Sequence, residues 1–140
     1  MSSMAVFKTT YRVTWSDTDA AEVVHHSNYF RIFERAEEEF YEHLGFSIDR
    51  LAEQGLWLPR IEVCCKYKAP SRFGDVLEIS MVLEDLQRKT VKYSFKVRKQ
   101  GAEAILAEGY VVAANADKEL GIAIDIPQEF VDRLKKFMKR

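Results

Sequence analysis

Cysteine, proline and glycine are all scarce in this chain, whose 140 residues include two cysteines, three prolines and six glycines. The cysteines are adjacent, at Cys64 and Cys65, in a segment with a strand-like pattern. Neighbouring side chains of a strand point to opposite faces, so no disulfide is predicted between them. With no run rich in glycine or proline, the sequence also lacks any flexible linker or low-complexity segment.

An excess of charge of one sign and long apolar runs are missing as well. The 21 basic and 22 acidic residues leave a net charge of -1, which gives no reason to expect a nucleic-acid partner. No apolar run approaches the ~20 residues that span a bilayer, and the N-terminus lacks the pattern of a signal peptide. We therefore expect a cytoplasmic protein without membrane insertion.

The composition that remains is globular, with 47% hydrophobic and 31% charged residues. We expect residues 1–140 to form one domain. The longest regular pattern predicts an amphipathic helix that ends before Gly45, with Ser27 and Asn28 as capping candidates. Its apolar face consists of Tyr29, Ile32, Phe33, Ala36, Phe40 and Leu44.

Five other segments have the pattern of strands: residues 7–15, 56–67, 76–86, 90–99 and 104–115. Residues 90–99 alternate cleanly, whereas residues 110–114 are apolar on both faces and are expected near the centre of the sheet. A short helix is predicted at 47–54 and an amphipathic one at 127–139. Because the last three strands are joined by short connections, the pattern predicts an α+β fold, an antiparallel sheet around the long helix.

Two carboxylates, Asp17 and Asp19, lie just before the N-terminus of the long helix. Unpaired N–H groups at a helix start can hold a developing negative charge while a nearby carboxylate acts as base or nucleophile, which suits acyl transfer. Either aspartate could instead bond loop N–H groups, and we favour that role for Asp17. His25 and His26 are adjacent, so their side chains point apart, and no third ligand supports a metal site.

Several motifs at matching spacing resemble the 4-hydroxybenzoyl-CoA thioesterase family of hotdog-fold enzymes, and most closely its Tol-Pal-associated acyl-CoA thioesterase branch. The likeness covers nearly the whole chain. The motifs are Asp17-Thr18-Asp19-Ala20, Val23-Val24-His25-His26, Asn28-Tyr29, Phe33-Glu34, Lys68-Ala69-Pro70, Phe73-Gly74-Asp75, Leu106-Ala107 and Ile126-Pro127.

The resemblance implies a hotdog fold and hydrolysis of an acyl-CoA to a free acid and coenzyme A. It makes Asp19 the catalytic carboxylate, either nucleophile or general base, and the backbone N–H of His26 the oxyanion donor. A leaving thiol with a pKa near ~8.5 needs little help from an acid, so these two groups can suffice. No metal or cofactor is implied, because coenzyme A enters as part of the substrate.

The same resemblance implies further contacts and partners. His25, Tyr29 and Glu34 are candidates for the pocket wall, while Arg88 and Lys89 are candidates for binding the phosphates of coenzyme A. Hotdog sites of this kind lie between subunits, so a homodimer or a dimer of dimers is expected.

Two positions depart from the family pattern. Glu22 stands where glycine is usual, which makes a positive φ costlier and could affect the pocket. Glu37 replaces a common arginine, and we expect this to be a surface change. Two other functions stay open: a hotdog hydratase or dehydratase that uses His25 or His26 with Glu34, and a non-catalytic module that binds acyl-CoA or acyl carrier protein. Acyl length and aromatic or aliphatic preference are not predicted.

Overall fold

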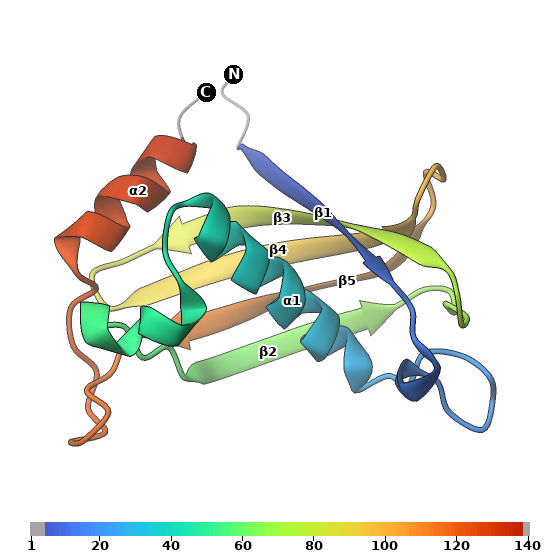
Figure 1. Ribbon diagram of the computed structural model, residues 1–140, viewed down its shortest axis with the longest axis horizontal. Coiled ribbons are helices and arrows are strands. Elements are labelled where there is room, and N and C mark those ends of the chain that lie inside the picture. Colours follow the sequence, from blue (N-terminus) through green and yellow to red (C-terminus); the bar gives the residue numbers. More distant parts are fainter. Residues whose placement is uncertain (1–4, 139–140) are drawn as a thin grey trace.

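Five antiparallel strands form one sheet in the computed structural model, which describes residues 5–138 (Figure 1). The order across the sheet is β1-β3-β4-β5-β2, so β4 is central and β5 lies inside the sheet beside it. The bounds of β3 and β4 are those predicted, and β5 is one residue shorter at each end. The strands are β1 Val6–Arg12, β2 Arg60–Tyr67, β3 Val76–Leu86, β4 Thr90–Lys99 and β5 Ile105–Ala114.

The long helix α1, Asn28–His43, lies across one face of this sheet, as predicted (Figure 1). Its apolar face is buried, and the rings of Phe33 and Phe95 stack with centroids 4.5 Å apart. Gly45 follows with φ of 93°, a left-handed conformation suited to glycine. The prediction of side-chain capping was wrong, because Ser27 instead bonds His25 and the Asn28 amide donates to the carbonyl of Asp17.

Three predicted boundaries need correction. β1 ends at Arg12 rather than at residue 15, because the chain turns into a 3-10 segment, Trp15–Asp17, that leaves Trp15 83% exposed. Residues 47–54 form two 3-10 turns, Ile48–Arg50 and Ala52–Gln54, since so short a segment gains little from α-helical bonding. β2 begins at Arg60, four residues later than expected.

A second helix, α2 Gln128–Met138, packs beside the C-terminal end of α1. Phe130 and Leu134 are buried, and the Phe130 ring lies 5.4 Å from that of Tyr41. The predicted end of this helix, at residue 139, lies outside the described residues. Neither helix of the described chain combines the length and apolar character of a membrane span.

Within residues 5–138, β2 lies at one edge of the sheet and pairs with β5 alone. Gly109 allows this pairing, because a Cβ there would meet the backbone oxygen of Cys64 at 2.0 Å. Val63 lies opposite the buried Val111, so it points to the same side as α1, yet it is 44% exposed. Its neighbours along this face, Ile61 and Tyr67, are 60% and 49% exposed. The predicted apolar face of β2 is therefore uncovered in the isolated chain.

Candidate active site

Asp17 holds together the segment between β1 and α1. Its Oδ2 atom accepts hydrogen bonds from the backbone N–H of Thr14 at 2.8 Å, the hydroxyl of Thr14 at 2.9 Å and the hydroxyl of Tyr11 at 2.7 Å. Its carbonyl accepts the N–H of His25 and the amide of Asn28. Asp17 is buried, and its Oδ2 atom and carbonyl oxygen together accept five hydrogen bonds, which agrees with the loop-shaping role expected from the sequence.

Asp19 stands at the start of a tight turn two residues further on. The N–H of Asp19 bonds the carbonyl of Val23 at 3.0 Å, and the N–H of Glu22 bonds the carbonyl of Asp19 at 2.9 Å. One carboxylate oxygen, Oδ1, accepts the N–H of Ala21 at 2.9 Å. The turn thus fixes the direction of the Asp19 carboxylate. The Asp19 side chain is half-buried and lies at the wall of a cleft.

Glu22 closes this turn with φ of 65° and is the only non-glycine residue with positive φ in residues 5–138. This is the position at which the resembled family usually has glycine. A side chain in this left-handed conformation costs energy, because Cβ crowds the following carbonyl. The Glu22 side chain is exposed and is not part of the cleft wall, so the departure strains the turn without narrowing the cleft.

The cleft beside Asp19 has a volume of about 390 Å³. It brings together three residues predicted from the sequence, Asp19, His26 and Tyr29. Tyr67 and Lys68 were not predicted as site residues, although the alternation of β2 placed Tyr67 at the end of its apolar face. The lining residues are Asp19, Val23, Val24, His26, Tyr29, Tyr67, Lys68, Ala69 and Pro70.

The backbone around His26 is held on both sides. The carbonyl of His25 accepts the N–H of Asn28 at 2.9 Å, and the carbonyl of His26 accepts the hydroxyl of Tyr67 at 2.9 Å. Within residues 5–138, the N–H of His26 has no hydrogen-bond acceptor. A fixed, unused N–H just before a helix N-terminus is suited to accept an oxyanion.

Two tyrosines complete the wall next to His26. The Tyr29 hydroxyl bonds that of Ser71 at 2.9 Å, and burial raises the pKa of Tyr29. Burial, together with Cys65, raises the pKa of Tyr67 to about 12. The rings of Tyr29 and Tyr67 meet edge to face with centroids 5.5 Å apart. Both hydroxyls therefore stay protonated at neutral pH, and Tyr67 remains a hydrogen-bond donor.

The other residues predicted for the site do not line the Asp19 cleft. The ring of His25 bonds the hydroxyl of Ser27 at 2.8 Å, and its centroid lies 4.1 Å from that of the His26 ring, so the prediction that these two side chains point apart was wrong. Arg88 and Lys89 follow β3, at the end of the sheet where β2 begins, whereas the Asp19 cleft is at the end of β2. Arg88 pairs there with Asp125 at 3.0 Å. A single chain does not bring either basic residue to Asp19.

Glu34 lines a second cleft, of about 370 Å³, formed between α1 and the segment that leads into β2. Glu37 lies in the same wall and is only 3% exposed, so its prediction as a surface residue was wrong. Glu37 is four residues after Phe33, and this helical spacing turns it to the buried side of α1. The lining residues are Glu34, Glu37, Glu38, Tyr41, Ile48, Leu51, Ala52, Leu56, Trp57, Leu58 and Arg60.

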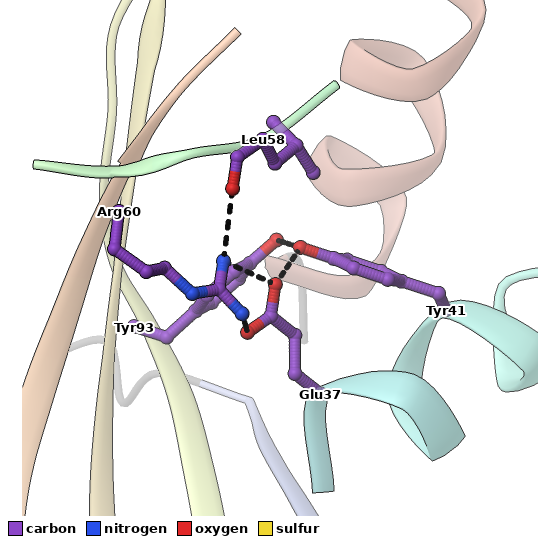
Figure 2. A network of polar contacts seen from close by, with 5 residues as sticks. All are labelled: Glu37, Tyr41, Leu58, Arg60 and Tyr93. Carbon is purple, nitrogen blue, oxygen red and sulfur yellow. Dashed lines mark hydrogen bonds and ion pairs between the residues drawn. The ribbon is translucent and has the colours of Figure 1, made fainter. Parts of the chain in front are cut away.

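Figure 2 shows the polar network that accommodates the buried Glu37. Its carboxylate accepts two hydrogen bonds from Arg60, at 2.5 and 3.2 Å, and one from Tyr41 at 2.5 Å. Tyr41 also bonds Tyr93 at 3.0 Å. Burial raises the pKa of Glu37 despite the opposing effects of Arg60 and Tyr41, and burial raises the pKa of Tyr41 well above its ordinary value. Sequence patterning gave no sign of this network because its members come from three separate elements.

The antiparallel sheet that packs around α1 defines a hotdog-fold protein, with Asp19 in a cleft beside the start of that helix. Residues 13–134 match the model of the Thioesterase-like superfamily, and the chain belongs to this superfamily.

Named relatives and solved structures agree with this assignment. A protein of Aquifex aeolicus with the provisional name of an esterase is 36% identical over 124 residues, which cover 89% of this chain and 94% of that protein. The acyl-CoA thioester hydrolase YbgC of Escherichia coli O6:H1 is 29% identical over 92 residues, which cover 66% of this chain and 69% of that protein. The solved structure of a gentisyl-coenzyme A thioesterase matches with a TM-score of 0.81 and 27% identity, and the match covers 92% of this chain and 99% of that one. The predicted hotdog fold and thioesterase class are confirmed.

Proposed function

We propose that this protein is an acyl-CoA thioesterase of the Tol-Pal-associated branch, acting in the cytoplasm, which hydrolyses its substrate to a free acid and coenzyme A. The observation that carries the proposal is a cleft lined by both Asp19 and His26, two residues before the start of α1, with the N–H of His26 free of any acceptor within residues 5–138. The chain supplies the carboxylate and the donor, and coenzyme A enters as part of the substrate rather than as a cofactor.

In the proposed reaction, the thioester carbonyl oxygen accepts a hydrogen bond from the N–H of His26. Asp19 then either attacks the carbonyl carbon, giving a mixed anhydride that water hydrolyses, or removes a proton from a water that attacks directly. On either route the negative charge that develops on the carbonyl oxygen is stabilised by the N–H and by the start of α1. Collapse of the tetrahedral intermediate breaks the C–S bond and releases coenzyme A as a thiolate, which takes up a proton.

We also propose that the active protein is a dimer formed through β2. An edge strand with exposed Ile61, Val63 and Tyr67 is an unsatisfied surface that a second copy can cover. A two-fold axis beside this strand pairs the two β2 strands antiparallel. The start of one β2, at Arg60, then meets the end of the other, at Tyr67 of the partner subunit.

This dimer would also bring the remaining candidates within reach of a cleft. Arg88 and Lys89 lie at the Arg60 end of the sheet, so they would approach the partner's cleft and its bound coenzyme A. Basic side chains there would favour the phosphates. Two such dimers could associate further without altering this pairing.

The test measures thiol release from aliphatic and aromatic acyl-CoA esters by the native protein and by Asp19→Asn. We expect release from at least one ester, reduced about 100-fold or more in the variant. Asp117→Asn is the matched control, because Asp117 also accepts backbone N–H bonds in a loop but lies away from the cleft. Release that survives in Asp19→Asn would refute the assignment of the carboxylate.

The outcome also separates the two other functions. Tight binding of an acyl-CoA without any thiol release would identify a binding module. Addition of water to an enoyl-CoA, with saturated esters untouched, would identify a hydratase. That second reaction needs His25 or His26 to work with Glu34, which lines the other cleft of the same chain.

A further inference from the structure

The cleft beside Glu37 has an unusual combination of walls. One side is apolar, formed by Leu51, Leu56 and Leu58 among others, and the α1 side carries the carboxylates of Glu34, Glu37 and Glu38. Within the described residues, Arg60 is the one basic side chain that lines it. Three acidic groups against one basic group leave the wall with an excess of negative charge.

Arg60 is not free to bind an anion in this arrangement. Its two terminal nitrogens contact both carboxylate oxygens of Glu37, and one of them also contacts the carbonyl of Leu58 at 3.4 Å (Figure 2). The Tyr41 hydroxyl fixes the carboxylate from the other side. The positive charge of Arg60 is therefore already compensated by Glu37, although the Arg60 side chain remains 31% exposed.

The cleft lies at the start of β2, and the Asp19 cleft lies at its end. The antiparallel dimer described under the proposed function, on which this step rests, sets the Glu37 cleft of one subunit against the Asp19 cleft of the other. An acyl group attached to a thioester at one Asp19 would then extend toward the Glu37 cleft of the partner subunit.

We propose that the Glu37–Arg60 cleft is the far end of the acyl pocket that serves the partner's Asp19, and that its ion pair makes the enzyme selective for acyl groups with an uncharged end. An alkyl or aryl end packs on the leucine wall and gains from burial. A carboxylate end would lose its hydration beside the negative charges of Glu34 and Glu38. It would gain no ion pair in return, because Arg60 is already paired with Glu37.

The matched substrates are hexanoyl-CoA and adipoyl-CoA, which have acyl chains of equal length and differ in a terminal methyl or carboxylate. We expect the native protein to favour hexanoyl-CoA, and Glu37→Gln to raise the adipoyl-to-hexanoyl ratio of kcat/KM about tenfold or more, because it leaves the charge of Arg60 without its compensating carboxylate. Arg60→Gln is the control. It disrupts the same ion pair but adds no positive charge, so it should not raise the ratio.

Mixed dimers test whether the two clefts cooperate between subunits. In a dimer of one Asp19→Asn chain and one Glu37→Gln chain, the working Asp19 faces the native Glu37 of the other chain, so the native selectivity should persist. In a dimer of a native chain and a chain with both substitutions, the working Asp19 faces the Glu37→Gln substitution of the other chain, so the selectivity should be relaxed. Relaxed selectivity in the first dimer and native selectivity in the second would overturn the proposal, because Asp19 and Glu37 of one chain would then serve the same site.

A ratio unchanged in a folded Glu37→Gln protein would also overturn the proposal, while hydrolysis of hexanoyl-CoA would still uphold the thioesterase function. If no ester is hydrolysed by the native protein, the proposed function itself fails. Should Glu37→Gln not fold, the double variant Glu34→Gln and Glu38→Gln takes its place. These side chains are more accessible, so we expect a rise of about threefold in the ratio, and no rise would count against the selective cleft.

Discussion

The hydroxyl of Tyr67, the last residue of β2, donates a 2.9 Å hydrogen bond to the carbonyl of His26, 41 residues earlier in the chain. This bond ties the edge of the sheet to the turn that begins α1. Because Tyr67 has a pKa raised to about 12, it keeps its proton and this role across the physiological range. The position of the proposed oxyanion donor thus depends on the strand at which we expect a second subunit to bind.

Tyr67→Phe should therefore lower kcat about 3- to 10-fold with little change in KM, because it removes one net hydrogen bond worth about 1 kcal/mol that holds the backbone at His26. Steady-state hydrolysis of the preferred ester measures the effect. Tyr110→Phe is the control: it also lies near the edge of the sheet, but its hydroxyl bonds Glu62 rather than the turn. A change confined to KM would instead make Tyr67 a simple substrate contact.

The strained turn at Glu22 predicts a gain in stability. Glycine adopts the left-handed conformation without strain, so Glu22→Gly should relieve the folded state of roughly 1–2 kcal/mol. Glycine also gives the unfolded chain more conformational freedom, which offsets part of this, so the free energy of unfolding should rise by about 0.5–1 kcal/mol. Urea unfolding measures it. Ala21→Gly, one residue earlier and without positive φ, should give no gain. Since Glu22 does not line the cleft, kcat/KM should stay within about twofold of the native value.

The elements that the sequence predicted well are those whose pattern is local. The helix over Asn28–His43 and the strands β3 and β4 repeat their apolar residues over ten or more positions, so one buried face determines each. The errors fall where side chains from distant elements decide. Asp17 ends β1 early by bonding Thr14, and the segment before β2 follows the contacts of Asn115, whose amide binds the carbonyl of Gly55.

The site divides in the same way. The motif around Asp19 and His26 was visible because its residues are close in sequence. Tyr67 enters through the return of β2 to the start of α1, and Glu37 was misjudged because its partner Arg60 is 23 residues away. An acidic residue at a buried helical position predicts a partner, but the sequence does not say which one.

The buried Glu37 predicts an unusual dependence of stability on pH. Burial raises its pKa in the folded protein above the ordinary value of 4.5, so the folded state holds this proton more tightly than the unfolded state. The corresponding stabilisation is fully present below pH 4.5 and is lost as the pH rises through the raised value. The difference in free energy of unfolding between the native protein and Glu37→Gln should therefore fall with rising pH.

Urea unfolding of both proteins at intervals from about pH 4 to about pH 8 measures this difference. Glu38→Gln is the control, since it removes one carboxylate from the same cleft and leaves the Arg60 pair intact. A difference that grows with pH would mean that Arg60 stabilises the charged carboxylate by more than burial disfavours it.

The exposed face of β2 predicts that one charge at its centre separates the subunits. Val63→Lys should convert the dimer to a folded monomer, because a lysine pair at a two-fold axis loses apolar contact and adds repulsion. Sedimentation at several concentrations measures the mass, and thiol release should fall at least about tenfold because each cleft lacks the partner's wall. Leu120→Lys, on an exposed loop away from β2, should change neither. A Val63→Lys monomer with native activity would show that one chain holds the whole site, whereas an intact dimer would move the interface to another surface.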